Sequence, residues 1–473
     1  MLSRFESLTF RYIVPAVAAL CLLGWCWSVF TPHFAFDDAE SEILNQAWRL
    51  AQAEQLYKPI ADKPFLHTAY TPFYFALTAL SLKLTGLSTI GGKLISLLSA
   101  LAIGLAFLKL GKRWHQKISP GFLLFCFLLL TPAFLYNLAR VHVQMLAVAL
   151  TIWALILLLT KDSISSTILA ALLAVLALLT KQTEIALPIA AICWLALRDK
   201  RRLAVFAATF LALALSSFAT LQWLTNGEFF INAVSTNLLT YDVTDIPLIL
   251  IHWAGPLIVV VIIAAVSVWA RLRERSADLL DVYFIGVVLQ TILTSGRLGA
   301  HSQYVVELCV VTFIIVLRQW PVRPMLIFAQ ALLLIVYAPL FVLFEEGGPA
   351  RAASAAANRV YSVIRTVDGP VLSQQGSFSL FTRGEIAVQL FQFSSLSRLG
   401  LWDQTRLLSD VESKRFAWVI TEFDVTSNGL SSSDRERFTP ELIEAIRKNY
   451  IVRQDVAPYF ILRPKVTEGA SDP

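Results

Sequence analysis

The stretch TPFYFALTALSLKLTG, residues 71–86, decides the fold of this 473-residue chain, because the orientation of every later segment depends on whether it crosses a membrane. It is apolar, but it is shorter than the roughly 20 residues that a membrane-spanning helix needs, and it contains Lys83. Eleven other apolar segments are candidate spans: 10–30, 91–110, 119–136, 143–160, 164–180, 185–197, 203–223, 250–269, 282–296, 303–317 and 325–344.

The charges of the connecting loops test both possibilities for residues 71–86, because Lys and Arg collect in the cytoplasmic loops of membrane proteins. If 71–86 does not cross, 15 basic residues share one side: Arg4, Arg11, Lys112, Arg113, Lys117, Lys161, Arg198, Lys200, Arg201, Arg202, Arg271, Arg273, Arg275, Arg318 and Arg323. If it does cross, 13 of these 15 move to the other side. We therefore expect 71–86 to be an interfacial or re-entrant helix, with eleven crossings, a cytoplasmic N-terminus and an extracytoplasmic C-terminus.

The composition agrees with a membrane protein: 57% of the residues are hydrophobic, the mean hydropathy is +0.66 and only 15% are charged. A soluble globular chain is closer to a quarter charged, so an ordinary soluble enzyme is excluded. The net charge of +6 would suggest nucleic-acid binding in a soluble protein. Here the loop topology accounts for it, and we expect no nucleic-acid partner.

The charged residues divide the chain into two parts. Residues 345–473 contain 31 charged residues among 129, which is close to the soluble norm. We therefore expect a membrane domain over 1–344 and a small soluble α/β domain over 345–473, with the boundary near Glu345–Pro349. Strand-like runs in the second part are 371–372, 416–423 and 459–462, and helical patterns are 405–413 and 439–450. All five cysteines lie in the first part, where they are expected to be apolar filler.

The first outer segment, residues 31–90, is long and carries an amphipathic pattern over 37–56. Apolar side chains recur there at helical spacing between charged ones, which predicts a helix lying along the membrane surface.

Polar residues at the outer membrane boundary are costly and need a reason. With the topology above, they gather on the outer side and predict an outward-facing polar cavity: Asp37, Asp38, His67, Tyr70, Lys93, Arg140, His142, Lys181, Gln182, Glu184, Arg297, His301, Gln303, Tyr304 and Glu307. Two groups among them carry specific chemistry.

Asp37 and Asp38 begin the amphipathic helix directly after the first span. One interpretation is helix capping, because an Asp side chain accepts backbone N–H bonds at a helix start. The other is general-base catalysis, because a carboxylate that is partly removed from water can take a proton from a hydroxyl.

Lys93, Arg140, Lys181 and Arg297 are the sparse cations of the outer side. Each alone could be a residue whose charged head reaches the membrane boundary. Together they suit a phosphate or pyrophosphate held at the lipid surface, although Glu184 and Glu307 could neutralise them as ion pairs.

The common sequence motifs of nucleotide-binding proteins, metalloproteases and serine hydrolases are absent. The sequence has no Walker loop, no Rossmann-type glycine motif, no HExxH and no nucleophile elbow. His67 and His142 form no convincing metal set. We expect no cofactor, and a divalent metal is left open.

The chain resembles the membrane glycosyltransferases of the GT-C fold that use polyprenyl-phosphate sugars, in particular protein O-mannosyltransferase-like and lipid A aminoarabinose transferase-like bacterial enzymes. The resemblance covers most of 10–310 and is carried by the order and spacing of short motifs: Phe36-Asp37-Asp38-Ala39-Glu40, Gln55-Leu56-Tyr57-Lys58, Tyr70-Thr71-Pro72-Phe73-Tyr74, Gly92-Lys93-Leu94-Ile95-Ser96 and Thr180-Lys181-Gln182-Thr183. Gly400-Leu401-Trp402-Asp403 is similar to the outer domain of such enzymes.

The resemblance implies a GT-C-like polytopic α-helical membrane protein with about 11 transmembrane helices, interfacial helices in the first outer loop and a small C-terminal α/β domain. Asp37 matches the first acid of the family's Asp-Glu pair, the acceptor-activating base, and Asp38 replaces the Glu. Lys93 stands where the family usually has Arg, and His142 lies where an Asp is often found. The departure at His142 leaves open whether a second acid or a metal takes part.

The implied activity is transfer of a sugar from a polyprenyl-phosphate donor to a glycolipid, polysaccharide or protein of the envelope, with inversion, at the outer face of a bacterial inner membrane. Lys93, Arg140, Lys181 and Arg297 would hold the phosphate. His67, Tyr70, His142, Gln182, Glu184, His301, Gln303, Tyr304 and Glu307 would contact substrate. Two other functions are possible alternatives. One is a secondary transporter or lipid flippase, which the absence of repeated halves in the sequence disfavours. The other is a non-catalytic envelope-assembly protein.

Overall fold

The computed structural model describes residues 12–31, 37–237, 240–322, 324–345, 347–425, 427 and 431–465. Three of the predicted cytoplasmic cations, Arg4, Arg11 and Arg323, lie outside the described residues, as do Phe36 and Glu346.

Every predicted span coincides with a helix or a run of helices. They are α2 (Val14–Phe30), α5 (Ile90–His115), α6 (Ser119–Leu129) with α7 (Pro132–Asn137), α8 (Gln144–Thr160), α9 (Ile164–Leu178), α10 (Ala186–Arg198), α11 (Lys200–Leu224), α13 (Asp245–Ala254) with η3 (Gly255–Leu257) and α14 (Ile258–Arg273), α15 (Leu279–Ser295), α16 (Val306–Arg318) and α17 (Pro324–Leu340). Among the described residues, the helices over 90–115, 200–224, 245–273 and 325–344 are each long and apolar enough to cross a membrane alone. The chain is a multi-pass membrane protein, and the number of crossings remains a prediction.

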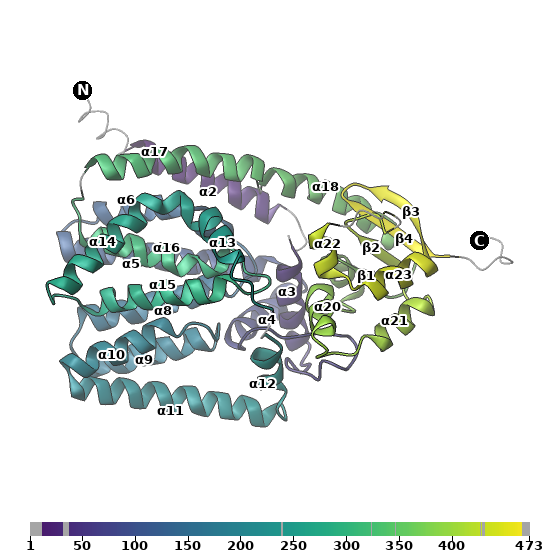
Figure 1. Ribbon diagram of the computed structural model, residues 1–473, viewed down its shortest axis with the longest axis horizontal. Coiled ribbons are helices and arrows are strands. Elements are labelled where there is room, and N and C mark those ends of the chain that lie inside the picture. The colour runs from purple at the N-terminus through teal and green to yellow at the C-terminus, as the bar shows by residue number, and fades with distance from the viewer. Residues whose placement is uncertain are drawn as a thin grey trace.

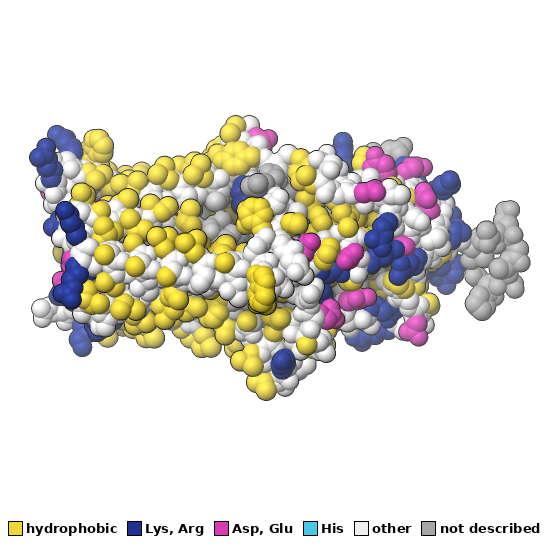
Figure 2. All heavy atoms as spheres, turned by 90° about the horizontal axis from the view of Figure 1, so that it is seen from below, with side chains coloured by type: hydrophobic (Ala, Val, Ile, Leu, Met, Phe, Trp, Pro, Cys, Tyr) yellow, Lys and Arg dark blue, Asp and Glu magenta, His cyan; other side chains and the backbone are white. Residues whose placement is uncertain are grey.

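The basic loops gather at one end of this helix bundle. Arg202, at the start of α11, forms an ion pair with Asp162 in the loop between α8 and α9. His115, at the end of α5, lies 2.6 Å from the carbonyl oxygen of Leu317 near the end of α16. Arg318 in turn contacts Asp278 before α15 at 2.9 Å. Figure 2 shows Lys and Arg side chains at this end and a hydrophobic band along the adjacent helices.

The helices of the first outer segment lie at the other end of the bundle. Helices α3 (Asp38–Ala51) and α4 (Phe73–Thr85) stand between the bundle and the C-terminal elements, with the short α12 (Glu228–Ala233) nearby (Figure 1). Helix α4 has 13 residues, about 20 Å of helix, and α10 and α16 have the same length; that α4 does not cross the membrane therefore stays a prediction from the loop charges. Helix α3 ends at Ala51, five residues before the predicted end, because the chain turns at Ala53, whose φ is +63°.

The C-terminal part is a four-stranded sheet with helices on both faces. Its elements are α18 (Gly347–Ile364), β1 (Val371–Ser373), α19 (Gly376–Arg383), α20 (Leu390–Arg398), α21 (Thr405–Glu412), β2 (Trp418–Thr421), α22 (Ser432–Arg437), α23 (Pro440–Asn449), β3 (Tyr450–Val456) and β4 (Tyr459–Pro464). The strand order is β1-β2-β4-β3, with β1 and β2 parallel and the other pairs antiparallel.

The sheet buries both of its faces. Val371, Ile420 and Ile461 pack on one side with residues of α18, such as Val360. Leu372, Val419 and Leu462 point to the other side and pack with residues of α20, α21 and α23. This alternation follows from the two-residue period of a strand and gives the sheet one hydrophobic core on each face; the core on the α20, α21 and α23 side also includes Phe65 of the first outer segment.

The predicted boundary near Glu345–Pro349 overlaps the end of one helical element and the start of the next. A π-helix, η5 (Phe341–Glu345), follows α17, and α18 begins at Gly347. Figure 1 shows α17 and α18 following one another along one side of the molecule, toward the sheet.

Candidate active site

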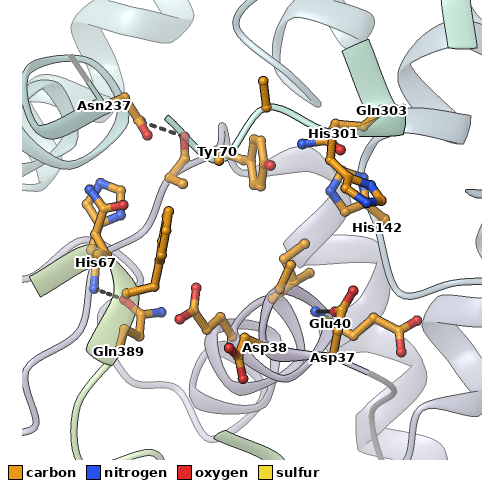
Figure 3. Close-up of a pocket in the computed structure, with 18 of the residues that line it drawn as sticks. Asp37, Asp38, Glu40, His67, Tyr70, His142, Asn237, His301, Gln303 and Gln389 are labelled. Atoms are coloured by element: carbon orange, nitrogen blue, oxygen red, sulfur yellow. Dashed lines mark hydrogen bonds between the residues drawn. The ribbon is translucent and has the colours of Figure 1, made fainter. Parts of the chain in front are cut away.

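A cavity of about 500 Å³ lies where three parts meet: the end of the bundle opposite the basic loops, the segment that contains α3, and the C-terminal part. Ten residues predicted for the site line it: Asp37, Asp38, His67, Tyr70, Arg140, His142, Arg297, His301, Gln303 and Tyr304. Figure 3 shows side chains from these separate segments converging on one space. Lys93, Lys181, Gln182, Glu184 and Glu307 are not among the lining residues.

Asp37 caps α3 and also faces the cavity. One carboxylate oxygen, Oδ1, accepts the backbone N–H of Glu40 at 2.8 Å, and the other, Oδ2, accepts from Nη2 of Arg140 at 2.6 Å. The hydroxyl of Tyr136 lies 3.4 Å from Oδ2. The side chain keeps 38% of its surface accessible. The two interpretations of Asp37, helix cap and cavity group, are therefore compatible.

The charge of Asp37 follows from its neighbours. Burial raises the pKa of this carboxyl group, while Arg140, the Glu40 N–H, His301 and His142 lower it, and the net pKa lies below its ordinary value. Asp37 is therefore an ionised carboxylate at neutral pH, which is the form that can accept a proton.

Arg140 is fixed by contacts on every side, and only 2% of it is exposed. Its Nε lies 3.5 Å from Oε1 of Glu40, and its guanidinium carbon lies 4.1 Å from the centre of the Tyr136 ring. Glu40 also accepts the backbone N–H of Val141 at 2.7 Å. The guanidinium thus orients Asp37 from a pre-built position, and the alternative that Arg140 only reaches toward the membrane boundary does not describe it.

Asp38 and Glu42 form an acidic side of the cavity. Arg437, the last residue of α22, places its Nε 3.2 Å from Oδ2 of Asp38. Burial is the main cause that raises the pKa of Asp38 to about 7, with Arg437 opposing it and Glu422 and Asp37 adding to it. Burial, together with Asp38 and Asp37, raises the pKa of Glu42 to about 8. Both carboxyl groups are therefore partly protonated at neutral pH.

Arg297, His142 and His301 line the cavity from the membrane bundle. Arg297 donates to the backbone oxygen of Asn237. His301 contacts the hydroxyl of Ser302 at 3.0 Å and packs against Trp253 with ring centres 4.7 Å apart. Burial lowers the pKa of His301 to about 4 and that of His142 to about 3. Both imidazoles are neutral at pH 7, so the positive charge of this side comes from arginine.

Lys93 and Lys181 lie behind the cavity wall. Lys93 is fully buried in α5 and donates to the backbone oxygen of Val29 at 2.6 Å. Lys181 donates to the side-chain oxygen of Gln144, and its ammonium lies 4.5 Å from the centre of the Tyr304 ring, which does line the cavity.

The remaining predicted residues hold the wall together from behind. Gln182 donates to the backbone oxygens of Ala69 and Ala233 at 2.7 and 2.8 Å. Glu184 lies 3.4 Å from the amide nitrogen of Gln144, and Glu307 contacts Tyr283 and accepts from Gln290 at 2.8 Å. These contacts are structural, and the predicted substrate contacts of these residues stay untested.

Several lining residues were not expected to contribute: Glu40, Glu42, Tyr136, Asn237, Gln389, Gln392, Glu436 and Arg437. Glu40 could have been found, because an acid three residues after an N-cap Asp is a capping-box signal. Arg437 could not, because nothing in the sequence links α22 to the start of α3. Within the described ranges, no group of three or more His, Cys, Asp or Glu residues could hold a metal ion.

Comparison with known proteins identifies the class of enzyme. Residues 68–296 match the model of glycosyltransferase family 87. None of the curated protein sequences matches the chain. The fold and the family match together define a membrane glycosyltransferase of the GT-C fold, which confirms the predicted fold class and the predicted type of enzyme.

Similar solved structures share the fold over nearly the whole chain. ArnT from Cupriavidus metallidurans, bound to undecaprenyl phosphate, superposes with a TM-score of 0.64 at 13% identity, covering 94% of this chain and 97% of that one. The apo form of ArnT gives 0.62 at 14% identity, with the same coverage of both chains. The Archaeoglobus fulgidus oligosaccharyltransferase AglB, in complex with an inhibitory peptide and a dolichol-phosphate, gives 0.53 at 9% identity over 98% of this chain and 75% of that one.

Proposed function

We propose that this protein transfers a sugar from a polyprenyl-phosphate donor to a hydroxyl group of an envelope acceptor, with Asp37 as the general base and with inversion at the anomeric carbon. The observation that carries the proposal is the placement of Asp37: an ionised carboxylate, partly exposed in a cavity of about 500 Å³, held by Arg140 at 2.6 Å. The lipid phosphates bound by ArnT and AglB support a donor of this class.

The reaction needs a base and an anion site. The acceptor oxygen forms a bond to the anomeric carbon while its proton passes to Asp37. The bond from that carbon to the phosphate oxygen breaks, and its electron pair stays on the phosphate. Because a phosphate is a good leaving group, no general acid is needed, and Arg297 with the neutral His301 can stabilise the developing charge. Phosphate contacts at Lys93 and Lys181 are not part of this proposal, because both ammonium groups bind protein atoms behind the wall.

The orientation in the membrane is the second part of the proposal. The basic loops lie together at the end of the bundle opposite the cavity, and cytoplasmic loops are the basic ones. We infer that the N-terminus faces the cytoplasm of a bacterial cell, that the chain lies in the inner membrane, and that residues 345–473 form an extracytoplasmic domain on a membrane domain of residues 1–344.

The activity is tested with purified protein and a panel of polyprenyl-phosphate sugars, each labelled in the sugar, together with an envelope lipid extract. We expect one donor to yield a labelled product with the wild-type chain. Asp37→Asn should lower the rate by about 10²–10⁴-fold, the range of general-base contributions. Asp62→Asn is the control, because Asp62 is an exposed acid of the same outer segment that does not line the cavity. Full activity of Asp37→Asn would refute the base assignment.

The orientation is tested with single cysteines in a chain whose five native cysteines are replaced. Lys161→Cys lies in a basic loop and Glu412→Cys at the end of α21, and both positions are exposed. A membrane-impermeant thiol reagent added to spheroplasts should label position 412 and not position 161. The opposite pattern would reverse the topology.

A further inference from the structure

The cavity has two walls of different chemistry. One wall comes from the membrane bundle and carries Arg297, His142 and His301. The other comes from α3 and the C-terminal part and carries carboxyl and amide groups. In Figure 3, His142, His301 and Gln303 lie on one side of the cavity, and His67 and Gln389 lie on the opposite side. Asp38 is closer to Gln389, and Asp37 is closer to His142.

The acidic wall is built rigidly. Arg398 of α20 donates to the backbone oxygens of Glu436 and Phe438 at 3.0 and 2.9 Å, which fixes the end of α22. That fixed end presents Arg437 to Asp38 at 3.2 Å. The C-terminal part is therefore positioned against the first turn of α3 and does not merely lie near it.

Two glutamines of the C-terminal part complete this wall. Gln389 accepts the backbone N–H of His67 at 2.6 Å, and Gln392 donates to the backbone oxygen of Thr236 at 2.9 Å. These bonds use the oxygen of Gln389 and the nitrogen of Gln392, and both side chains line the cavity. The amide nitrogen of Gln389 and the oxygen of Gln392 provide one donor and one acceptor for a hydroxyl-bearing ligand.

The geometry of the proposed reaction indicates which wall faces the leaving phosphate and which wall faces the acceptor. In a displacement with inversion, the nucleophile and the leaving group lie on opposite faces of the anomeric carbon. The leaving phosphate needs the arginine side. The acceptor hydroxyl must then approach from the acidic side and still reach Asp37, which stands between the two walls.

We propose that the wall formed by α3 and the C-terminal part is the acceptor subsite, and that it selects an uncharged, hydroxyl-rich acceptor, a carbohydrate, over one with a phosphate or carboxylate near the reacting hydroxyl. This inference rests on the proposed function and adds to it the position and the charge of the acceptor. Carboxyl and amide groups both donate to and accept from sugar hydroxyls. An anionic group beside Glu436 and the ionised form of Asp38 would be repelled, and such repulsion is a source of specificity.

The raised pKa values of Asp38 and Glu42 agree with this role. A partly protonated carboxyl group can donate a hydrogen bond as well as accept one. The charged neighbours that act on Asp38 are Arg437 from α22, Glu422 after β2 and Asp37 on its own segment. One arginine among these acids leaves the wall without the net positive charge that an anionic acceptor would require.

The test uses the donor that the wild-type chain accepts, labelled in the sugar, and an envelope lipid extract separated by anion exchange into an uncharged and an anionic fraction. We expect label in the uncharged fraction. Glu436→Lys changes an exposed cavity residue and should preserve folding. It should raise the apparent KM for the uncharged acceptor about tenfold, which is the effect of one lost interaction of ordinary strength, and it should increase labelling of the anionic fraction.

Controls separate the acceptor from the donor. Glu42→Ala, which removes the hydrogen-bonding group, should also raise the KM for the acceptor, while Glu412→Lys, an exposed acid on α21 away from the cavity, should change neither KM. Thermal stabilisation by undecaprenyl phosphate, the probe for donor binding, should be unchanged in all three variants. Label in the anionic fraction of the wild type, or a change in the KM for the donor alone, would overturn the acceptor subsite. No transfer to either fraction and no stabilisation by undecaprenyl phosphate would overturn the proposed function itself.

Discussion

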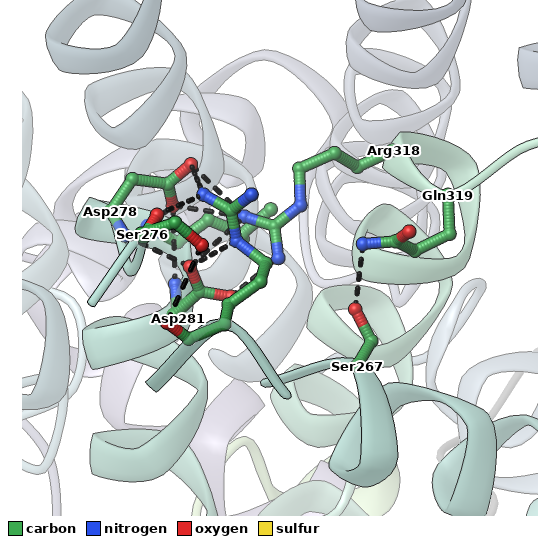
Figure 4. Close-up of polar contacts among 8 residues, drawn as sticks. Ser267, Ser276, Asp278, Asp281, Arg318 and Gln319 are labelled. Atoms are coloured by element: carbon green, nitrogen blue, oxygen red, sulfur yellow. Dashed lines mark hydrogen bonds and ion pairs between the residues drawn. The ribbon is translucent and has the colours of Figure 1, made fainter. Parts of the chain in front are cut away.

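Two clusters of carboxylates and arginines stand at opposite ends of the helix bundle, and each caps the first turn of a helix. At the basic end, Asp278 caps α15 in a capping box with Asp281, and Arg271 and Arg318 both bind this pair (Figure 4). At the cavity end, Asp37 caps α3, and Arg140 contacts both Asp37 and Glu40.

The difference between the clusters lies in what their carboxylates face. Asp281 has no exposed surface and is bound by two arginines, so its bonds stay within the protein. Asp37 keeps 38% of its side-chain surface accessible and opens on the cavity. The same pair of residue types therefore connects three helices at one end and places a partly exposed carboxylate in the cavity at the other.

The largest effect on stability is expected at the basic end. Asp281→Ala leaves Arg271 and Arg318 with fewer partners beside a buried gap. Breaking a buried ion pair on one side costs about 3–5 kcal/mol, and we expect a loss of that size in the free energy of unfolding, measured by SDS titration in mixed micelles. Sugar transfer per folded molecule should stay normal, because the cluster lies at the far end of the bundle.

The matched control for this change is an exposed ion pair. Arg415→Ala removes a contact of 3.3 Å with Asp410 from a side chain that is 51% exposed, and such pairs contribute about 0–1 kcal/mol. Equal losses for the two variants, or loss of transfer by folded Asp281→Ala, would mean that the two ends do not divide stability and chemistry between them.

The next effect is expected at the cavity end. Arg140→Lys keeps the charge but removes the planar fork that contacts Asp37 and Glu40 together. A misplaced catalytic group costs about 10²-fold, and we expect a decrease of that size in kcat/KM while the chain still folds. Arg383→Lys is the control, because Arg383 binds backbone oxygens of Gly369 and Ile364 and does not line the cavity. Normal kcat/KM in Arg140→Lys would show that the charge alone orients Asp37.

The helices could be predicted because their signals are local. Long apolar runs mark the spans, and the basic residues between them mark one end of the bundle. Strand β3 (Tyr450–Val456) was missed because Arg453, Gln454 and Asp455 put three consecutive polar, exposed residues in its middle, which interrupts the apolar alternation of a strand; it pairs with β4 along its whole length.

The site could be predicted in part. Asp37 and Arg140 were found because a charge at the membrane boundary stands out against apolar surroundings. The same signal also selected Lys93, whose ammonium instead binds the oxygen of Val29 inside the bundle. Arg437 was missed because its contact with Asp38 joins segments almost 400 residues apart, and a sequence shows which residues are unusual but not which of them meet.

The last effect is expected from the acidic wall, and it is a change in how stability depends on pH. The pKa of Glu42 is raised in the folded protein to about 8, mainly by burial. Its protonated form is therefore favoured by folding. The stability that it contributes is fully present below the unfolded pKa near 4.3 and is lost as the pH rises through about 8.

Glu42→Gln removes this titration and keeps the shape of the side chain. Between pH 5 and 9 the melting temperature of the wild type should fall more steeply than that of Glu42→Gln, with the two curves diverging most above pH 7. Asp403→Asn should not flatten the curve above pH 7, because hydrogen bonds from Thr405 lower the pKa of the Asp403 carboxyl group. Parallel curves for the wild type and Glu42→Gln would mean that Glu42 stays ionised in the folded protein, and the acidic wall would then be a stronger barrier to anions than its partial protonation implies.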